Sequence, residues 1–495
     1  MSCHPLALSL AVILASSFTH CKAADWPQFR GPNCTGIAGD PTPLPTVFSA
    51  KSNVVWSTDL GDGIGSPVVA AGRVFVTSMK DNQTVALTGF AVATGKQLWQ
   101  RTWQTGHLVD IHKTNSQAAT TPCADSERVY FYFSTLGLIT VDAATGADVW
   151  NIEMPTPFFV FKWGAGMSPV LHEDKLIFCQ DDDLYPGIMV MDSTTGKILW
   201  KESRDDMAVN YSHPVVAKTS NGTELVVAGT GKVTGYDLEK GGRIWESRVL
   251  LRNIKTTPVV DGNTIYISLQ SGGIANQWLA TVDRAETGNN DDRLDKQEIQ
   301  DFVGQQPIPE AFFRRTFDRG DMNKDGFLEG EELDRAFLHP DNHAGASFDD
   351  ETPADEYILA LQAGGQGDVT QTHLLWKHST KHTDHIVSPI ITGNQMLLIK
   401  GGGIATCFNT QGGKSLFSRP QRIENTCEYF ASPVYGDGKI YVAGENGFVV
   451  VLKNEGSHLE ILARNDMGDA ILANPAISDG RIFIRTRSQL ICVAN

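Results

Sequence analysis

The sequence predicts an all-β protein, an eight-bladed β-propeller with four strands in each blade. Two repeated patterns predict this fold: an apolar run that opens on proline, and a shorter run that ends in an aromatic residue. The proline openings are separated by 55, 47, 45, 44, 131, 44 and 42 residues. A period in the low-to-mid forties with four strands per unit is typical of propeller blades. The openings are Pro67, Pro122, Pro169, Pro214, Pro258, Pro389, Pro433 and Pro475.

The unit from Ser168 to Trp200 shows the four strands of one blade. Short apolar runs separated by turn residues predict strands at 169–172, 175–179, 188–192 and 197–200. Gly196 stands where a tight hairpin needs a positive φ. Because one such sheet cannot bury both faces, the repeats are expected to pack on one another. The closing half recurs as ATGKQLW (93–99), ATGADVW (144–150), TTGKILW (194–200), KGGRIW (240–245) and QGGKSLF (411–417).

The two ends of the repeat region complement each other. The last unit, from Asn474, has room for only three strands before Asn495. Residues 54–56 carry a closing tryptophan with no blade in front of it, so they are expected to supply the missing fourth strand. Pairing of the first and last strands would close the ring and remove a sheet edge. Several independent β-domains are the alternative, and the regular spacing argues against them.

Composition and charge narrow the class of protein. The chain of 495 residues is 41% hydrophobic and 20% charged, as in ordinary globular proteins. Its net charge of −16 argues against general binding of nucleic acid or of anionic membranes. The eight cysteines lie far apart and form no CxxC pair, so a zinc site is not expected. Export would permit a disulfide, for example one that involves Cys34, but the sequence does not give its pairing.

The chain is expected to divide into an export signal, a propeller and an insertion. Residues 6–18 are an apolar run too short to span a bilayer, and small residues near position 23 follow it, which predicts a signal peptide at 1–23. Propeller blades are expected at 24–275 and 356–495, and the insertion at 276–355. We therefore expect an exported protein of the periplasm or cell envelope, with no membrane span.

The insertion contains a calcium-binding pattern. The spacing of 131 residues between Pro258 and Pro389 leaves roughly 87 extra residues, between the second and third strands of blade five. Residues 321–332 match the EF-hand loop D-x-[DN]-x-[DN]-G-x5-E, with Gly326 at the sharp turn. Apolar residues indicate flanking helices: Phe312, Phe313 and Phe317 before the loop, and Leu333, Phe337 and Leu338 after it. The expected calcium ligands are Asp321, Asn323, Asp325, the Phe327 carbonyl, Glu329 and Glu332.

A second loop upstream, residues 287–298, offers a poorer match to the same pattern. Thr287 stands at its first position and Asp292 where glycine belongs, so we expect it to bind calcium weakly or to serve as a structural partner. Residues 276–355 hold 20 acidic and 8 basic side chains, so most of the net negative charge belongs to this insertion. The ligands it offers are Asn289, Asp291, the Arg293 carbonyl, Asp295 and Glu298.

The closing motif, the repeated x-P-V opening and the segment DWPQFRGP at 25–32 resemble those of PQQ-like eight-bladed propellers. That family includes quinoprotein alcohol dehydrogenases and BamB-like envelope proteins. The resemblance implies that the closing tryptophans pack between blades. It also implies that the loops before the first strands converge on a central funnel.

The funnel loops are rich in groups able to bind a small polar ligand. His382, Asp384 and His385 raise the possibility of a metal site or an acid–base pair, and a solvated loop is the alternative. Trp163 is a candidate floor for a quinone or, equally, a core aromatic residue. The funnel candidates are His112, Lys113, Asn115, Lys162, Trp163, Asn210, Tyr211, His213, Lys255, His382, Asp384, His385, Glu428 and Tyr429.

The sequence favours an exported, calcium-binding propeller that acts without catalysis, as a binding or scaffold protein for a protein partner or a small polar ligand. The alternative is a PQQ- and calcium-dependent quinoprotein oxidoreductase. Against it, the chain lacks the adjacent Cys-Cys pair of those enzymes, and their calcium-holding and catalytic residues find no match here. A third hypothesis is a hydrolase or lyase that uses His112, His382 or His385. No catalytic residue is assigned.

Overall fold

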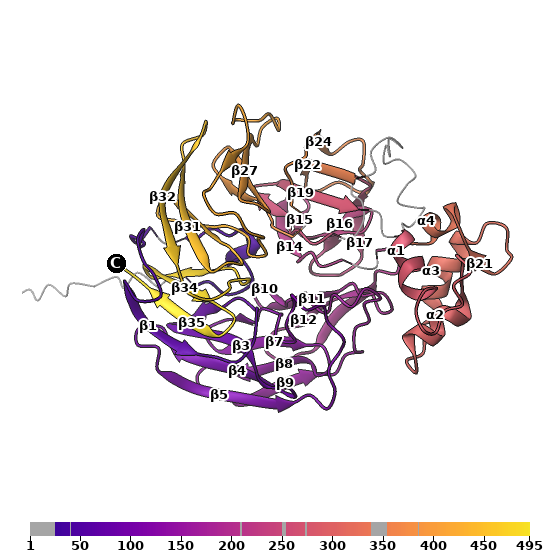
Figure 1. The fold of residues 1–495 in the computed structure, drawn as a ribbon, viewed down its shortest axis with the longest axis horizontal. Coiled ribbons are helices and arrows are strands. Elements are labelled where there is room, and N and C mark those ends of the chain that lie inside the picture. Colours follow the sequence, from indigo (N-terminus) through magenta and orange to yellow (C-terminus); the bar gives the residue numbers. More distant parts are fainter. Residues whose placement is uncertain are drawn as a thin grey trace, which may run out of the picture.

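The computed structural model describes residues 25–39, 41–207, 210–249, 254–272, 275–337, 354–384 and 386–495. The expected signal peptide at 1–23, Leu338 and His385 lie outside these residues. Eight sheets of four or five strands surround a central channel (Figure 1). The prediction of an eight-bladed β-propeller is therefore confirmed.

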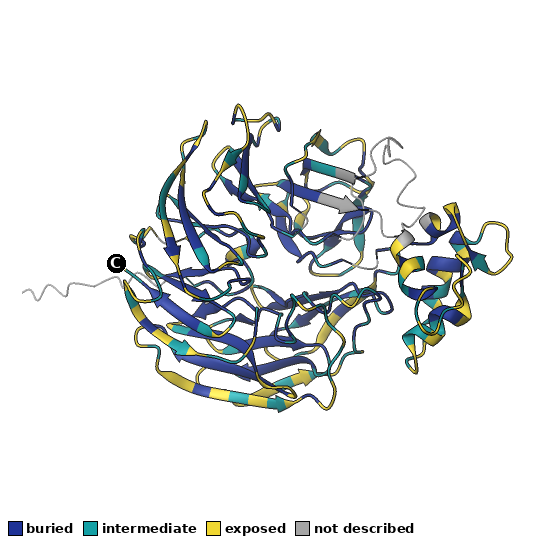
Figure 2. Ribbon diagram, viewed as in Figure 1, coloured by how far each residue is buried: buried dark blue, intermediate teal, exposed yellow. Residues whose placement is uncertain are grey.

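Each blade is an antiparallel meander that runs from the channel to the rim of the ring (Figure 1). Figure 2 shows that the inner strands are buried, and that in the outer strands exposed residues alternate with more buried ones. Blade 1 is β2 (Val68–Ala70), β3 (Arg73–Asp81), β4 (Thr84–Ala91) and β5 (Gln97–Gln104). Blade 2 is β6 (Cys123–Ala124), β7 (Arg128–Phe133), β8 (Gly137–Asp142) and β9 (Asp148–Ile152). Blade 3 is β10 (Val170–His172), β11 (Lys175–Gln180), β12 (Gly187–Asp192) and β13 (Ile198–Ser203).

The remaining blades follow the same order, with an addition to blade 4. Blade 4 is β14 (Val215–Thr219), β15 (Gly222–Gly229), β16 (Lys232–Asp237) and β17 (Arg243–Ser247), and β23 (Gly367–Asp368) adds a fifth, parallel strand. Blade 5 is β18 (Val259–Asp261), β19 (Thr264–Gly272), β22 (Ala354–Gln362) and β24 (Leu374–Ser379). Blade 6 is β25 (Ile390–Thr392), β26 (Gln395–Lys400), β27 (Ile404–Asn409) and β28 (Gln421–Arg422). Blade 7 is β29 (Val434–Gly436), β30 (Lys439–Ala443), β31 (Phe448–Asn454) and β32 (Leu459–Asp466).

Blade 8 joins the two ends of the repeat region, as the sequence predicts. It consists of β33 (Ala476–Ser478), β34 (Arg481–Arg485), β35 (Gln489–Val493) and, at its outer edge, β1 (Val54–Asp59). β1 pairs antiparallel with β35, and Trp56 lies opposite Cys492. The N-terminal strand thus closes the ring. A short 3-10 turn, η1 (Pro32–Cys34), precedes it.

The closing tryptophan of one blade packs on the tight turn of the next. Trp99 of blade 1 donates its indole N–H to the carbonyl of Ala143 in blade 2, at 3.0 Å. Its ring lies on Gly146, where an added Cβ would approach Trp99 to 2.7 Å. Gly146 has φ +72°, so a side chain there is also strained. The same contact joins Trp56 to Gly95, Trp150 to Gly196, Trp200 to Gly241 and Trp376 to Gly413.

A ring of hydrogen bonds surrounds the channel at the residue before each opening proline. The backbone N–H of Ser66 donates to Thr121 Oγ1, and that of Thr121 donates to Ser168 Oγ, both at 3.0 Å. Among the described residues the one missing link is from Ser168 to blade 4, where His213 offers no side-chain oxygen. The other links run from His213 to Thr257, from Thr257 to Ser388, from Ser388 to Ser432, from Ser432 to Asn474 and from Asn474 to Ser66.

The segment 25–36 crosses the innermost strands of several blades. Trp26 pairs with Val69 of blade 1, and the Gln28 side chain accepts the N–H of Leu171 in blade 3. Asn33 exchanges two hydrogen bonds with Val216 of blade 4. The fully buried Arg30 donates to the Pro389 carbonyl of blade 6, at 2.6 Å. The segment therefore also joins blades that are not neighbours in the ring, such as blades 4 and 6.

Four helices lie between β19 and β22, at the rim of the ring (Figure 1). Two short strands, β20 (Leu294–Asp295) and β21 (Phe327–Leu328), pair with each other inside this insertion. None of the helices in the described part of the chain is long and apolar enough to cross a membrane. The six described cysteines form no disulfide among themselves. The helices are α1 (Ala275–Val282), α2 (Lys296–Val303), α3 (Glu310–Gly320) and α4 (Glu331–Phe337).

The tryptophan–glycine contact gives a prediction for stability. Gly196→Ala adds a Cβ that meets Trp150 at 2.6 Å, whereas Gly72→Ala adds one to open space. Both positions have a positive φ, so both variants carry about 1–2 kcal/mol of left-handed strain. We expect Gly196→Ala to lose about 1–3 kcal/mol more than Gly72→Ala, because the blade interface becomes overpacked. Denaturant unfolding followed by circular dichroism measures the difference, and equal losses would refute the role of this contact.

Candidate functional site

The loop between α3 and α4 has the local geometry expected of a calcium loop. Asp321 accepts the backbone N–H groups of Asp325 and Gly326 through its two carboxylate oxygens, at 3.2 and 3.0 Å. Asn323 Oδ1 accepts the same N–H of Asp325, and Asp325 Oδ1 accepts that of Phe327. Gly326 takes φ +89° at the turn. These bonds turn the predicted ligand groups toward the inside of the loop.

Glu332, at the last position of this loop, has one oxygen without a partner. Its Oε1 accepts the N–H groups of Met322 and Asn323, at 2.9 and 3.3 Å. The residue is only 6% exposed, and its Oε2 is buried without a hydrogen-bond partner among the described residues. An unpaired buried carboxylate oxygen is costly unless a cation or a donor meets it. The donor set, all oxygen and mostly carboxylate, fits a hard cation such as calcium.

The loop between α1 and α2 repeats this geometry with an acid that the sequence pattern missed. Asp283 is fully buried, and its two oxygens accept the N–H groups of Asp291 and Asp292, at 2.9 and 3.2 Å. These bonds match those of Asp321. Asp292 has φ +64° where Gly326 has +89°. Carboxylate oxygens of Asp283, Asp291 and Glu298 lie within 4.8 Å of one another.

Thr287, which stands at the first position of the predicted calcium loop, is exposed and does not occupy the place that Asp321 has in the other loop. Four additional residues separate Asp283 from Asn289, compared with Asp321 and Asn323, so a twelve-residue window excludes Asp283. Gly288 permits the detour, since a Cβ there would lie 2.0 Å from the Asp283 carbonyl oxygen. Asp283 directly follows the last residue of α1, and predicting that helix end could have identified Asp283 as a candidate ligand.

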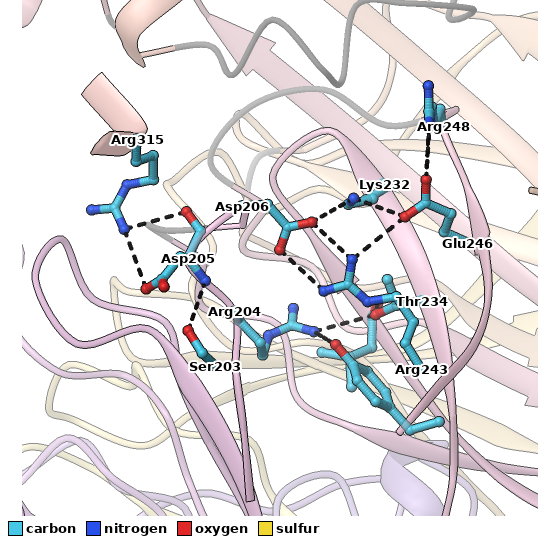
Figure 3. A network of polar contacts seen from close by, with 12 residues as sticks. Ser203, Arg204, Asp205, Asp206, Lys232, Thr234, Arg243, Glu246, Arg248 and Arg315 are labelled. Atoms are coloured by element: carbon cyan, nitrogen blue, oxygen red, sulfur yellow. Dashed lines mark hydrogen bonds and ion pairs between the residues drawn. The ribbon is translucent and has the colours of Figure 1, made fainter. Parts of the chain in front are cut away.

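The insertion packs against three loops that flank the strands of blade 3. Trp278, 2% exposed, meets Phe161 edge-on with ring centroids 6.1 Å apart, and Val160 and Leu184 join the same apolar cluster. Arg315 of α3 donates to the carbonyl oxygens of Asp183 and Asp205. Figure 3 shows Arg315 reaching from the helix toward Asp205, beside a network of ion pairs between blades 3 and 4. That network contains Asp206, Lys232, Arg243, Glu246 and Arg248.

Two buried carboxylates support this contact. Asp182 accepts the N–H groups of Phe158 and Tyr185, and Asp183 accepts that of Val160. Burial raises the pKa of Asp182 to about 6 and that of Asp183 to about 7, while the backbone bonds and Arg315 act in the opposite direction. Both carboxylates therefore fix the backbone of the loop that faces the insertion.

A cavity of about 400 Å³ occupies the channel, and it gathers many of the predicted funnel residues. Lys255 Nζ lies 4.9 Å from the centroid of the Trp163 ring, and the His112 ring lies 4.7 Å from the same ring. The side-chain amide of Asn115 donates a hydrogen bond to the Trp163 carbonyl, at 2.6 Å. Phe29, from the segment 25–36, stacks on His213 at 4.0 Å. The predicted residues that line the cavity are His112, Asn115, Trp163, Tyr211, His213, Lys255, Glu428 and Tyr429.

The other predicted funnel residues have structural roles or lie elsewhere. Lys162 is exposed and pairs with Asp110 at 2.9 Å. Asn210 is buried and bonds to Asp181, which forms a fully buried ion pair with Arg204. Asp384 accepts backbone N–H groups of its own loop and of Gly401, so it serves as a loop clamp. Lys113 and His382 do not line the cavity.

Comparisons with known proteins identify the repeat family. A family model described as outer membrane protein assembly factor BamB matches residues 45–159 and 163–313, which is more than half of the chain. The outer membrane protein assembly factor BamB of Yersinia pestis is 23% identical over 253 residues, 47% of this chain and 60% of that protein. The BamB of Moranella endobia (strain PCIT) is 21% identical over 252 residues, 47% of this chain and 61% of that protein.

A solved structure agrees at the level of the fold. The crystal structure of BamB from Moraxella catarrhalis has a TM-score of 0.52 and 14% sequence identity, over 89% of this chain and 97% of that chain. The chain spans about three fifths of the length of the curated relatives it matches.

The buried Asp183 predicts a pH-dependent stability. Its folded pKa of about 7 lies above the unfolded value near 3.8, so the folded state binds more protons between these values. Stability therefore falls as pH rises from about 4 to about 7, by up to about 1.4 kcal/mol per pH unit. Asp183→Asn removes this loss and should gain stability relative to the parent at pH 8 but not at pH 4. Denaturant unfolding in calcium-saturated buffer at both pH values tests it, and parallel pH profiles would contradict the assignment.

Proposed function

The chain belongs to the family described as outer membrane protein assembly factor BamB, and on that premise we propose that it is an exported, calcium-binding scaffold protein. In this proposal the propeller holds partner proteins of the cell envelope and performs no catalysis. The relatives are described as outer membrane protein assembly factors, which supports partners among envelope proteins. The signal peptide expected at 1–23 supports export.

The calcium part of the proposal rests on one observation, the buried and unpartnered Oε2 of Glu332. Together with the EF-hand spacing of residues 321–332, it favours a divalent cation in this loop. The ion would be held by Asp321, Asn323, Asp325, the Phe327 carbonyl, Glu329 and Glu332. A second ion would be held by Asp283, Asn289, Asp291, the Arg293 carbonyl, Asp295 and Glu298. When bound, calcium supplies positive charge that offsets the excess of acidic side chains.

Exposed apolar side chains on the rim support the scaffold role. The residue just before each closing tryptophan is exposed in several blades, for example Leu98 at 42% and Leu199 at 45%. Contiguous exposed apolar surface is typical of sites that bind other proteins, and in this proposal the repeated residues contribute to such a site. The members of this rim stripe are Val55, Leu98, Val149, Leu199 and Leu375.

The partner expected at the rim is an extended segment of another protein. The outermost strands leave one edge unpaired in most blades, and an unpaired edge is a template for a further strand. Blade 4 provides an example within the chain, since β23 adds itself in parallel to Trp245 and Glu246 of β17. The long β5, from Gln97 to Gln104, presents such an edge together with Leu98.

Calcium titration tests the metal sites. We expect the chelator-treated protein to bind two equivalents of calcium in isothermal titration calorimetry. Glu332→Gln should weaken one site, and Asp283→Asn the other, each by about tenfold or more, because each loses a carboxylate ligand. Glu331→Gln changes the exposed neighbouring residue and should leave both sites intact. Unaltered binding by Glu332→Gln would place the calcium elsewhere.

Cross-linking in the host cell tests the scaffold role. The wild-type protein should be recovered with outer membrane assembly proteins, identified by mass spectrometry, and Leu98→Gln combined with Leu199→Gln should reduce their yield. Val47→Gln, which alters a residue 65% exposed but outside the rim stripe, should not.

The oxidoreductase alternative makes an opposing prediction. Reconstitution of the purified protein with PQQ and calcium would then give bound-quinone absorbance and alcohol-dependent dye reduction. The scaffold proposal expects neither, and both together would overturn it.

A further inference from the structure

His213 is the exception in the ring of hydrogen bonds around the channel. At the equivalent position the other blades carry serine, threonine or asparagine, whose side-chain oxygens complete the ring. His213 is 4% exposed and lines the cavity, and its Nδ1 lies 3.2 Å from Thr257 Oγ1. Its Nε2 is buried and has no hydrogen-bond partner among the described residues.

An imidazole in this place costs stability twice. The ring of hydrogen bonds loses a link, and a buried ring nitrogen stays unpaired, at about 1–3 kcal/mol. Burial and the nearby Arg30 lower the pKa of His213 to about 3, so the ring is neutral. A neutral imidazole offers either a donor or an acceptor at Nε2, depending on the tautomer. The hydroxyl of Tyr211, which lines the same cavity, is also buried without a partner.

The cavity also contains a cation that lacks a carboxylate partner. Lys255 Nζ faces the Trp163 ring at 4.9 Å, and among the described residues it forms no ion pair. Burial lowers the pKa of Lys255, with Asp384 opposing this effect from a distance. A desolvated ammonium gains from an anionic partner, and an anion that carries an aromatic ring can also pack that ring against the neighbouring indole. The backbone bond from Tyr211 N–H to the Ile254 carbonyl, at 2.8 Å, holds the two loops together.

The remaining walls combine aromatic residues with small polar and apolar ones and with Glu428, and the aromatic residues favour an organic ligand over an inorganic ion. Trp163, Tyr429, Phe430 and Phe29 line the cavity, and Phe29 stacks on His213 at one side. The volume of about 400 Å³ lies within the range of sites for small molecules.

We propose that the central cavity binds a small aromatic carboxylate that carries a second hydrogen-bonding group. Its carboxylate pairs with Lys255, its ring lies against Trp163, and its second polar group meets His213 Nε2 and Tyr211 Oη. This site is separate from the calcium loops and from the rim stripe, so it stands or falls independently of the scaffold role.

Calorimetry with three probes tests the proposal on the calcium-loaded protein. The probes are 4-hydroxybenzoate, benzoate and the uncharged benzamide. We expect affinity to fall in that order, by about tenfold at each step, as first the hydroxyl and then the charge is lost. Binding of benzamide as tight as that of benzoate, or no binding of any probe at millimolar concentration, would overturn the proposal.

Three variants identify the residues. Lys255→Met should abolish the preference for benzoate over benzamide, whereas Lys162→Met removes a neighbouring exposed lysine outside the cavity and should preserve it. His213→Ser should erase the preference for 4-hydroxybenzoate over benzoate and should also raise the melting temperature, because serine restores the missing link of the ring. A lower melting temperature with the hydroxyl preference retained would show that His213 serves packing alone and would overturn its role. An unchanged charge preference in Lys255→Met would overturn the role of Lys255.

Discussion

The contact between a closing tryptophan and the glycine turn of the next blade is the constraint on which this structure depends. The indole of Trp99 needs both the missing side chain of Gly146 and the carbonyl of Ala143, which accepts its N–H. Both belong to the neighbouring blade, so a blade alone leaves its tryptophan unpacked. In an open array of blades, the tryptophan of the last blade would stay unpacked, so the array is stabilised when it closes into a ring. The N-terminal strand β1 meets this need, because it brings Trp56 of blade 8 onto Gly95 of blade 1.

Function is expected where this repeat is interrupted, since regular positions are committed to packing. At blade 4 the closing Trp245 donates to Glu224 of its own blade instead of to a turn of the next. Gly364, just after β22, donates its N–H to the same carboxylate, and the fifth strand β23 follows. The helical insertion enters blade 5 beside this irregular interface. His213 interrupts the inner ring at the same blade, so both departures from regularity fall on one sector of the propeller.

The repeats and the local motifs could be predicted from the sequence because they depend on neighbours along the chain. The strands of residues 168–200 appear within three residues of their predicted bounds, and the longest deviation arises because Ser203 pairs with Gly187. Asp283 was not predicted as a candidate ligand, because the EF-hand pattern assumes a fixed loop length and this loop contains four additional residues. Asn210 was a plausible ligand, but it satisfies the buried Asp181, whose partner Arg204 could only be identified in three dimensions. Similarly, the missing link at His213 becomes visible only once the eight blades are arranged in a ring.

The loop of residues 158–163 links the insertion to the cavity, because some of its side chains contact the helices and others the cavity. Phe158, Val160 and Phe161 belong to the apolar cluster of the helices. Phe159 points the other way and stacks on Tyr211 at 5.3 Å, and Trp163 forms a wall of the cavity. The helices and the cavity therefore share one loop as a common neighbour. If calcium and a cavity ligand both bind and both order this loop, each would change the affinity of the other by the same factor. One short loop, residues 158–163, thus contacts both the helices of the insertion and the wall of the cavity.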